Sequence, residues 1–519
     1  MVWTELFIGG LIGLATSVSL IVLVLQASRR YGLPGRVGEA HHTHKTPIPR
    51  IGGIALAGAM VAVLLFFFFL SGPDFLRSNE RWLVIPASLA MFALGLWDDL
   101  FGLGAKRKLI GQLFIAIATF YCGIGIFQFK IPITYEIIDL GHWAGPVTVI
   151  WLVAMTNLIN LIDGIDGLAG GICLMLMVLL MYVSLQADLV PVVAAGMAGA
   201  LLGFLRFNFP PARIYMGDGG AYFLGFFIGC STIVTSHKGT IVAALMAPLF
   251  VLALPIIDTS VAILRRGLKG LPLFRPDRKH IHHRLLALGH SRRRVVLGLY
   301  AFTAFFLLLG FSTFCWRGQY FPVCLGTGVL IILLAAGKFS FSREWFSVGG
   351  VLGNSFEART DIQYAICLCR WLALEGKRAQ TQEDLAEDVV FIARKLGFAS
   401  VRIRLEDEEK TWSLIAIAKE NCDVYKHPLP GQKYCFLELS VGRPELQTSP
   451  TPGVSISTHS ISDILADLLA EGWIKAIGDW TKLHQLPVRF DARPKVPAVG
   501  ETVLPNTIQS RAETPPLDL

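Results

Sequence analysis

Carboxylates and a lysine lie together in a short polar segment that follows a long apolar run. Asp98 and Asp99 end the run, and Lys108 comes ten residues after Asp98. Adjacent carboxylates at a helix end repel each other and need a cation or hydrogen-bond donors nearby. Lys108, at the start of the next apolar run, could meet this pair or a phosphate. The alternative interpretation is a solvated helix end.

A second segment, NLINLIDGIDGLAGG, places polar side chains at every third position. On a helix, Asn157, Asn160 and Asp163 occupy nearly one face, and Asp166 follows after a glycine. An amide inside an apolar run is costly unless it has a function. These groups suit a sugar, a uracil ring or the water shell of a metal ion. The alternative is a pair of Asp-Gly turns at the end of a helix.

Asp218 stands among glycines in the segment MGDGG at 216–220, just before another apolar run. Glycines permit close backbone approach, and the amides at a helix N-terminus attract anions. Mg²⁺ typically takes one or two carboxylates together with substrate oxygens. Asp218 is therefore the candidate metal ligand, although Gly-Asp-Gly-Gly is also ordinary turn chemistry.

Histidines are concentrated in the most basic loop, DRKHIHHRLL at 277–286. Zinc ligands on a helix usually lie three or four residues apart, and Arg284 would repel a cation. Phosphate recognition is therefore favoured over zinc binding. The candidate residues for it are Arg278, His280, His282 and His283.

The elements that must position these residues are membrane-spanning helices. Of 519 residues, 53% are hydrophobic and only 16% are charged, which is too apolar for a soluble globule. A spanning helix needs about 20 mainly apolar residues. Eleven such runs are predicted, at 4–27, 51–71, 81–97, 109–128, 146–162, 167–186, 189–206, 221–236, 239–263, 295–315 and 320–337. Counting crossings puts the polar segments on one side of the bilayer.

Basic residues predict the orientation. Loops after odd-numbered runs carry about twenty Lys and Arg, against about five in the other loops. This places the N-terminus outside and the C-terminal region in the cytoplasm. The net charge of +8 is explained by topology and by contact with anionic lipid or phosphate, so no nucleic acid is expected as a partner. The nine cysteines indicate no disulfide framework.

About 180 residues follow the last run, enough for one soluble domain. Its pattern predicts a small α+β unit over 345–485. The expected helices are at 361–375, 382–396 and 460–478, and the expected strands at 400–405, 411–418 and 433–441. Length and element order resemble a GAF-type sensor domain, so a regulatory ligand or a docked protein is expected there. The proline-rich stretch 486–519 predicts a disordered tail.

The polar segments resemble, in their order along eleven spans, those of the polyprenyl-phosphate N-acetylhexosamine-1-phosphate transferases of glycosyltransferase family 4. The matching segments are Asp98-Asp99, NLINLIDGIDGLAGG, FNFPPARIYMGDGG and DRKHIHHRLL, and the resemblance covers about 1–338. The form DRKHIHHRL is closer to the WecA and TagO branch than to the MraY branch. The resemblance implies an all-α polytopic transferase domain in a bacterial inner membrane, with a cytoplasmic active site; a homodimer is a further expectation.

The implied reaction moves N-acetylglucosamine 1-phosphate, or a related acetamido-sugar 1-phosphate, from a UDP-sugar to undecaprenyl or another polyprenyl phosphate. UMP is released, and the product starts cell-envelope polysaccharide synthesis. Mg²⁺ is the implied cofactor, with Mn²⁺ as the alternative ion. Attack by the lipid phosphate itself is favoured over a covalent enzyme intermediate.

Residue roles follow from the same resemblance. Asp218 would bind the metal ion, Asp98 and Asp99 would handle the lipid phosphate or its proton, and Lys108 would touch phosphate. Asp163 and Asp166, counted among the catalytic carboxylates, would line the nucleotide pocket. Asn157 and Asn160 would bind substrate there. Arg278, His280, His282 and His283 would hold the diphosphate or the sugar.

The first polar loop matches the family only in part. Its end, HKTPIPRIGG at 44–53, has the family's His, Pro, Pro-Arg and Gly-Gly positions, which makes Arg50 a substrate-binding candidate. The preceding GRVGEAHH does not have the acid and the Arg-Lys pair at the positions common in the family, so the match does not imply a lipid-phosphate contact from this loop.

Two other classes of protein are alternatives. A secondary transporter would also combine many spans with buried carboxylates, but its site would lie near the membrane midplane rather than at helix ends. An inactive membrane scaffold for the soluble domain is the second alternative. The intact set of carboxylates argues against it.

Overall fold

The computed structural model describes residues 2–31, 48–71, 83–130, 136–186, 191–236, 289–315, 323–328, 359–405, 408–415, 422–429, 435–442 and 461–484, with scattered positions between 249 and 331. The chain divides into two compact units, Met1–Ser355 and Phe356–Leu519. The predicted tail at 486–519 lies outside the described residues.

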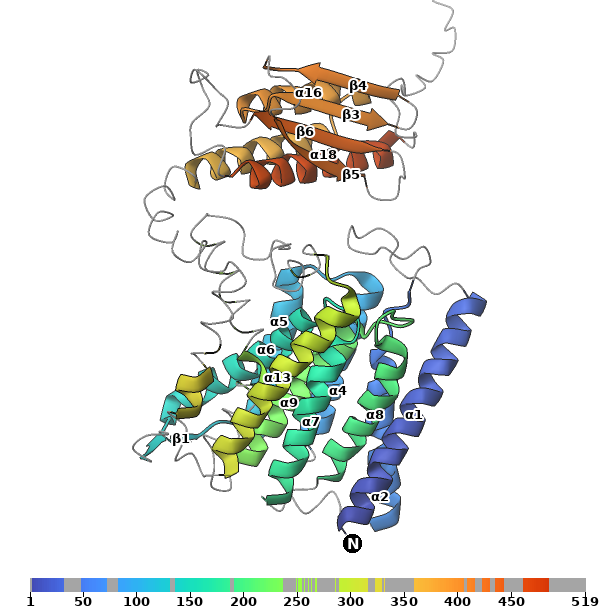
Figure 1. The fold of residues 1–519 in the computed structure, drawn as a ribbon, viewed down its shortest axis with the longest axis vertical. Coiled ribbons are helices and arrows are strands. Elements are labelled where there is room, and N and C mark those ends of the chain that lie inside the picture. The colour runs from blue at the N-terminus through green and yellow to red at the C-terminus, as the bar shows by residue number, and fades with distance from the viewer. Residues whose placement is uncertain are drawn as a thin grey trace, which may run out of the picture. The chain divides into compact units, whose positions relative to one another are not determined.

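The first unit is a bundle of apolar helices (Figure 1). Its long helices are α1 (Val2–Tyr31), α2 (Gly53–Ser71), α4 (Val84–Phe101), α5 (Ala105–Tyr121), α6 (Ala144–Ile162), α7 (Leu168–Gln186), α8 (Val192–Asn208), α9 (Gly217–Ser236) and α13 (Arg292–Cys315). Six of these, α1, α2, α4, α6, α7 and α13, are long and apolar enough to cross a membrane, so the protein is a polytopic membrane protein.

Nine of the eleven predicted runs correspond to these helices. The runs at 239–263 and 320–337 lie largely outside the described residues, so the count of eleven and the N-out, C-in orientation stay predictions. One element was not predicted: a short antiparallel hairpin of β1 (Gln128–Lys130) and β2 (Ile137–Asp139) precedes a turn of 3₁₀ helix at Gly141–Trp143.

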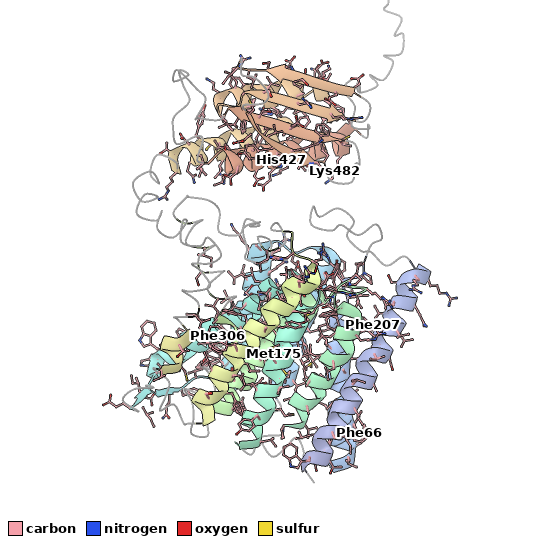
Figure 2. The ribbon with its side chains drawn as sticks, in the orientation of Figure 1. Phe66, Met175, Phe207, Phe306, His427 and Lys482 are labelled. Carbon is pink, nitrogen blue, oxygen red and sulfur yellow. The ribbon has the colours of Figure 1, made fainter. Side chains whose placement is uncertain are left out.

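Helix α9 is the central helix of this bundle, because it contacts α2, α4, α6 and α7. Phe223, Phe226 and Ile228 are fully buried. A helix that is apolar on all sides is expected to be enclosed by other helices. Side chains fill the spaces between the helices, as Figure 2 shows around the labelled Phe207 and Phe306.

The second unit has a four-stranded antiparallel sheet in the order β4-β3-β6-β5. Its strands are β3 (Ser400–Leu405), β4 (Glu408–Ser413), β5 (Cys422–Pro428) and β6 (Phe436–Gly442). Val401, Ile403 and Leu405 alternate along β3 and are buried. This face packs against α16 (Gln382–Lys395) and α18 (Ser462–His484).

Most of the elements predicted for this unit are present. A helix at 359–375, α16, β3 and α18 match expected elements, whereas β4 begins three residues before the expected 411. The prediction missed β5, CDVYKHP, because it shows no apolar alternation and contains a proline. The unit thus contains both helices and a sheet, as the predicted α+β class requires, and the GAF-type likeness stays a prediction.

Candidate functional site

Helix α4 ends in a tight turn that exposes its last carboxylates to other helices. Gly102 takes a left-handed conformation, with φ of 69°, and its amide donates to the carbonyl of Asp98. The amide of Leu103 donates to Asp98 Oδ1 at 2.6 Å. The Asp98 side chain is thereby held at the helix end, with its second oxygen free for another group.

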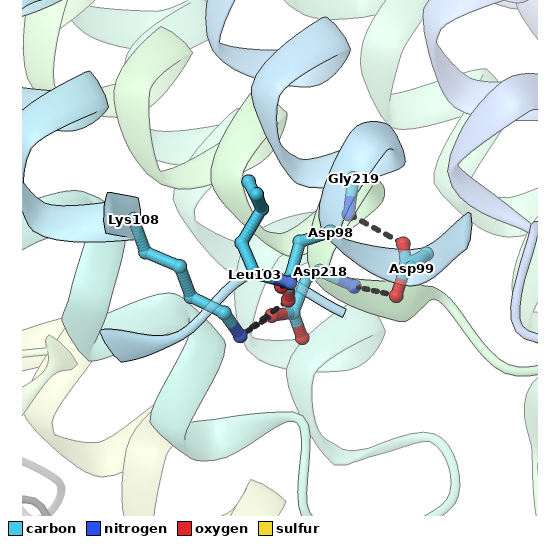
Figure 3. Close-up of polar contacts among 6 residues, drawn as sticks. All are labelled: Asp98, Asp99, Leu103, Lys108, Asp218 and Gly219. Atoms are coloured by element: carbon cyan, nitrogen blue, oxygen red, sulfur yellow. Dashed lines mark hydrogen bonds and ion pairs between the residues drawn. The ribbon is translucent and has the colours of Figure 1, made fainter. Parts of the chain in front are cut away.

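Lys108, in the first turn of α5, joins two carboxylates that are 120 residues apart in the chain. Its Nζ forms an ion pair with Asp98 Oδ2 and donates to Asp218 Oδ2 at 2.8 Å (Figure 3). The three charged groups sit at the ends of α4, α5 and α9. Two anionic oxygens therefore face one common point, where the lysine ammonium offsets their repulsion.

Asp99 caps the N-terminus of α9. Its Oδ1 accepts from the Asp218 amide at 3.0 Å and its Oδ2 from the Gly219 amide at 2.8 Å (Figure 3). These are helix-end amides with no partner inside the helix, and a carboxylate there is also favoured by the helix dipole. Gly217, with φ of 75°, starts this helix, and a side chain there would overlap Asp99 and the Arg50 carbonyl.

Glycine also brings α4 and α9 close enough for this capping. A Cβ added at Gly95 would lie 2.5 Å from the carbonyl oxygen of Asp218. A Cβ at Gly219 would lie 3.1 Å from the amide nitrogen of Leu96. The absence of side chains at these two positions lets the backbones approach, so the carboxylates of one helix reach the amides of the other.

The segment containing Arg50 is tied to the start of α9 by backbone hydrogen bonds. Gly52 and Gly53 donate to the carbonyls of Tyr215 and Met216, each at 2.9 Å. The charge of Arg50 acts on both Asp99 and Asp163. The predicted substrate-binding arginine therefore lies beside the carboxylate cluster.

Asp163 follows the last residue of α6 and faces the same cluster. Loss of hydration, followed by the charges of Asp218 and Asp99, raises the pKa of Asp163 well above its usual range. A carboxyl group of this kind binds a proton more tightly than an ordinary aspartate, which suits proton transfer. Asn160, one turn earlier, is partly buried, and its carbonyl accepts from the Asp163 amide at 3.3 Å.

Asp166 lies in the turn between α6 and α7 and contacts both the loop between α8 and α9 and the start of α13. Its Oδ2 accepts from the Ala212 amide at 3.2 Å and lies 3.6 Å from Arg292 Nη1. Asn208 strengthens the same junction, because it accepts from the Gly167 amide at 2.9 Å and donates to the Ile214 carbonyl at 2.8 Å. This junction fixes the chain that leads to Asp218. The role of Asp166 in the nucleotide pocket stays a prediction.

Sequence reasoning missed the anchoring role of α13. Arg293 donates to the Pro210 carbonyl at 2.8 Å, and the Tyr300 hydroxyl donates to the Gly167 carbonyl. The sequence signal for this role was the run of three arginines at the start of the helix. Such a run is equally expected as a determinant of the orientation of the chain in the membrane.

Asn157 lies one helical turn before Asn160 on α6, next to Gln112 of α5. The sequence analysis did not select Gln112 as a site residue. Its Nδ2 donates to Gln112 Oε1 of α5 at 2.7 Å and to the Val153 carbonyl at 2.8 Å. Gln112 is four residues after Lys108 and therefore shares its helix face. The four-residue spacing of Lys108 and Gln112 in KLIGQ could have predicted that Gln112 lies close to the site.

The carboxylate oxygens of the cluster fit the ligand preferences of Mg²⁺ better than those of a structural Zn²⁺ ion. Asp98 and Asp218 turn hard carboxylate oxygens toward one point. Among the described residues, no group of three or more His, Cys, Asp and Glu could hold a metal ion. Zinc sites need three or four protein ligands, whereas Mg²⁺ accepts one or two carboxylates and fills its shell with water and phosphate oxygens.

The fold thus brings most of the predicted site together from distant parts of the chain. Asp98, Asp99, Lys108, Asp163 and Asp218 meet at one end of α4, α5, α6 and α9. Arg50 lies beside them. The remaining candidates of the basic loop lie outside the described residues: Arg278, His280, His282 and His283.

Comparison with known proteins agrees with this geometry. The model of the family described as glycosyl transferase family 4 matches residues 81–236, which contain α4 to α9. A probable undecaprenyl-phosphate N-acetylglucosaminyl 1-phosphate transferase of Bacillus subtilis is 33% identical over 259 residues, covering 50% of this chain and 71% of that protein.

Two further relatives extend the same match. A decaprenyl-phosphate N-acetylglucosaminephosphotransferase of Mycobacterium tuberculosis is 34% identical over 284 residues, covering 50% of this chain and 70% of the relative. A phospho-N-acetylmuramoyl-pentapeptide-transferase of Desulforudis audaxviator is 30% identical over 329 residues, covering 58% and 96%. With its carboxylate cluster built inside the matched helices, the chain belongs to the polyprenyl-phosphate hexosamine-1-phosphate transferases of glycosyltransferase family 4.

Proposed function

We propose that this protein transfers N-acetylglucosamine 1-phosphate, or the 1-phosphate of a related acetamido sugar, from a UDP-sugar to a polyprenyl phosphate with the help of Mg²⁺. The convergence of Asp98, Asp99, Lys108 and Asp218 at the ends of three helices carries the proposal. Two anionic substrates that meet at a membrane surface need this kind of positive charge and metal-binding oxygen.

The chemistry is an exchange of one phosphoanhydride bond for another. An oxygen of the lipid phosphate forms a bond to the β-phosphorus of the UDP-sugar, while the bond from that phosphorus to the oxygen bridging the α-phosphate breaks. UMP leaves with the bridging oxygen. A bound Mg²⁺ ion would offset the charge of the diphosphate. Asp218 and Asp98 are the residues to hold it, and Lys108 stays within reach of a phosphate oxygen.

Proton handling is assigned to the carboxyl groups near the metal ligands. Asp163 has a raised pKa, so it can take up a proton that the acceptor phosphate loses as it attacks. Asp99 has both oxygens bound to the first amides of α9. Its role in this proposal is to fix the position of Asp218 rather than to react.

An exposed apolar stripe on α6, which leads to the cluster, supports a polyprenyl phosphate as the acceptor. Ile150 and Leu161 are exposed, by 68% and 37%, and Asn157 lies between them on the same helical face. Phe114 on the neighbouring α5 is 73% exposed. A polyisoprenoid chain along this surface would have its phosphate on the last two turns of α6, between Asn157 and Asp163.

The placement of charge favours a transferase over a transporter. The ionisable groups of the cluster sit at the ends of α4, α5, α6 and α9. A transporter site is expected near the midplane, at broken helices. We place the cluster on the cytoplasmic side of a bacterial inner membrane, on the strength of the Lys and Arg bias between loops.

A regulatory role is proposed for the second unit. Trp473 and Trp480 fill its core, and its exposed sheet face carries ion pairs such as Arg402 with Glu438 at 3.3 Å. Among its described residues, no three metal-ligating side chains gather. A sensor or docking function is therefore favoured over a second catalytic centre.

The test is UMP release by the purified full-length protein with UDP-N-acetylglucosamine, undecaprenyl phosphate and Mg²⁺. We expect release only when lipid and metal are both present. Asp218→Asn should reduce it at least about 100-fold, because removal of one charged group from a transition-state site costs that much or more.

Asp139→Asn is the matched control, since Asp139 lies in the β1–β2 hairpin and accepts from the Gly141 amide away from the cluster. It should keep normal turnover. Turnover with another UDP-acetamido sugar alone would change the donor but keep the reaction. No turnover with any donor would contradict the proposal.

A further inference from the structure

Asn157 uses both of its donor hydrogens inside the protein. One N–H donates to the carbonyl of Val153, four residues earlier on α6, at 2.8 Å. The other donates to Gln112 Oε1 on α5 at 2.7 Å. A backbone carbonyl can only accept, so the contact with Val153 fixes which end of the Asn157 amide is the nitrogen. Its carbonyl oxygen, Oδ1, must then point the other way.

Gln112 holds this orientation from a buried position. The side chain is 1% exposed, and its Oε1 is committed to Asn157. Its Nε2 is buried, and no described residue accepts a hydrogen bond from it. A buried donor without a partner lowers stability, so an apolar residue would serve simple helix packing better. The loss of stability from the unpartnered Nε2 is explained if the function of Gln112 is to fix the orientation of the Asn157 side chain.

The free group that Asn157 presents is a hydrogen-bond acceptor. Asn157 is exposed, and among the described residues nothing donates to its Oδ1. Phosphate oxygens without a proton are also acceptors, so this oxygen cannot bind them directly. The group that it recognises must carry a hydrogen.

We propose that Gln112 is a positioning residue that turns Asn157 Oδ1 toward the acceptor lipid, where it accepts a hydrogen bond from the hydroxyl of a singly protonated phosphate headgroup. This inference rests on the proposed function, and it specifies which form of the acceptor is bound. Phosphate monoesters lose their second proton near pH 6, so this form is present around neutral pH.

The position of Asn157 favours the lipid over the nucleotide sugar. Asn157 is six residues before Asp163, which places it about 9 Å deeper along the axis of α6. Its neighbours on the exposed face are Ile150 and Leu161, both apolar. The polyprenyl tail of the acceptor matches this apolar surface and brings its phosphate along it, whereas a UDP-sugar has no apolar part to lie there.

The experiment is a double-mutant cycle on the full-length enzyme, with steady-state kinetics measured separately for undecaprenyl phosphate and for UDP-N-acetylglucosamine. Gln112→Met removes the acceptor of Asn157 Nδ2 and keeps the side-chain length. We expect the KM for the lipid to rise about 3- to 10-fold, the range for loss of one neutral hydrogen bond, with kcat and the KM for the UDP-sugar unchanged. Asn157→Ala should have a similar effect.

The double variant decides whether Gln112 acts through Asn157. If it does, Gln112→Met adds nothing in the Asn157→Ala background. Multiplying effects would overturn the proposal, because they would mean that the two residues act independently. A rise in the KM for the UDP-sugar instead of the lipid would also overturn it, since Asn157 would then face the nucleotide substrate.

Thermal unfolding separates positioning from packing. Gln112→Met, and Gln112→Leu as a second variant, should be at least as stable as the wild type, because an unpartnered buried donor is removed. Lower stability with an unchanged lipid KM would show a packing role and overturn the proposal. Thr119→Val is the control on the same helix, since Thr119 is buried and its hydroxyl donates to the Ile115 carbonyl of its own helix. It should leave both KM values unchanged.

The wild-type enzyme distinguishes this inference from the function on which it rests. If the wild type releases no UMP with any donor, the proposed function fails. If the wild type is active and the cycle is additive, only the role of Gln112 fails.

Discussion

The α4–α9 and α1–α8 interfaces both depend on glycines that bring two backbones close together. Between α1 and α8, a Cβ at Gly13 would overlap the Gly196 carbonyl, and one at Gly199 would overlap the Gly10 carbonyl. Between α4 and α9, Gly95 has the same function beside Asp218. Small residues at such contacts are the usual basis of helix packing in membranes.

The two interfaces differ in what lies at the helix ends. The glycines between α1 and α8 lie against backbone atoms and against apolar or hydroxyl side chains, such as Ser17 near Gly203. Packing of α4 on α9 places two carboxylates at the first amides of α9 and beside a lysine. Close packing through glycines thus supports apolar helix contact between α1 and α8, whereas between α4 and α9 it brings the charged side chains of the candidate site together.

The largest effect is expected from Gly95→Val. The new side chain must push α4 away from α9, and a displacement of about 1 Å at a catalytic group costs on the order of 100-fold in rate. UMP release per folded molecule should fall by at least that factor. Gly298→Val is the matched control in α13, because nothing lies within 4 Å of a Cβ there; near-normal turnover in Gly95→Val would break the comparison.

Gly199→Val should lower stability without lowering turnover. The side chain clashes with α1, and overpacking of this kind costs about 1–3 kcal/mol. We expect a lower thermal midpoint and a lower yield of folded protein, whereas turnover per folded molecule stays within about threefold of wild type. A fall in turnover as large as that of Gly95→Val would mean that α1–α8 packing also positions the site.

The smallest effects concern two buried serines. Ser17 on α1 is fully buried, and its Oγ has no partner among the described residues. Ser88 on α4 donates to the Val84 carbonyl at 2.6 Å. Ser17→Ala should therefore be neutral or stabilising by up to about 1 kcal/mol, and Ser88→Ala should destabilise by a similar amount. Thermal unfolding in one detergent checks the pair; equal shifts in one direction would contradict this assignment.

Much of the site could be predicted because its residue types are unusual in a membrane. Asp98, Asp163 and Asp218 stand at the ends of apolar runs, where a carboxylate without a function is costly. Gln112 and Asn208 were missed because each is a single amide in an apolar or turn-like context. Their importance depends on partners far away in the sequence, Asn157 and Gly167, which no local pattern reveals.

The fold shows the same division. Nine apolar runs and the β3 alternation were predictable, since hydrophobic periodicity reflects burial directly. The start of β4 and the whole of β5 were not, because these edge strands are held by pairing with β3 and β6 rather than by a buried face of their own.

The sequence by itself determined that this protein lies in a membrane and belongs to a family of phosphosugar transferases, because helix length, apolar content and motif order are local properties of the chain. Only the tertiary structure decided that Asp99 caps α9, that Lys108 joins Asp98 to Asp218, and that Gln112 accepts a hydrogen bond from Asn157. Lys108 is ten residues from Asp98, whereas the other contacts span 45 to 120 residues. The contacts between α4 and α9 exist because glycines such as Gly95 let these two helices approach closely.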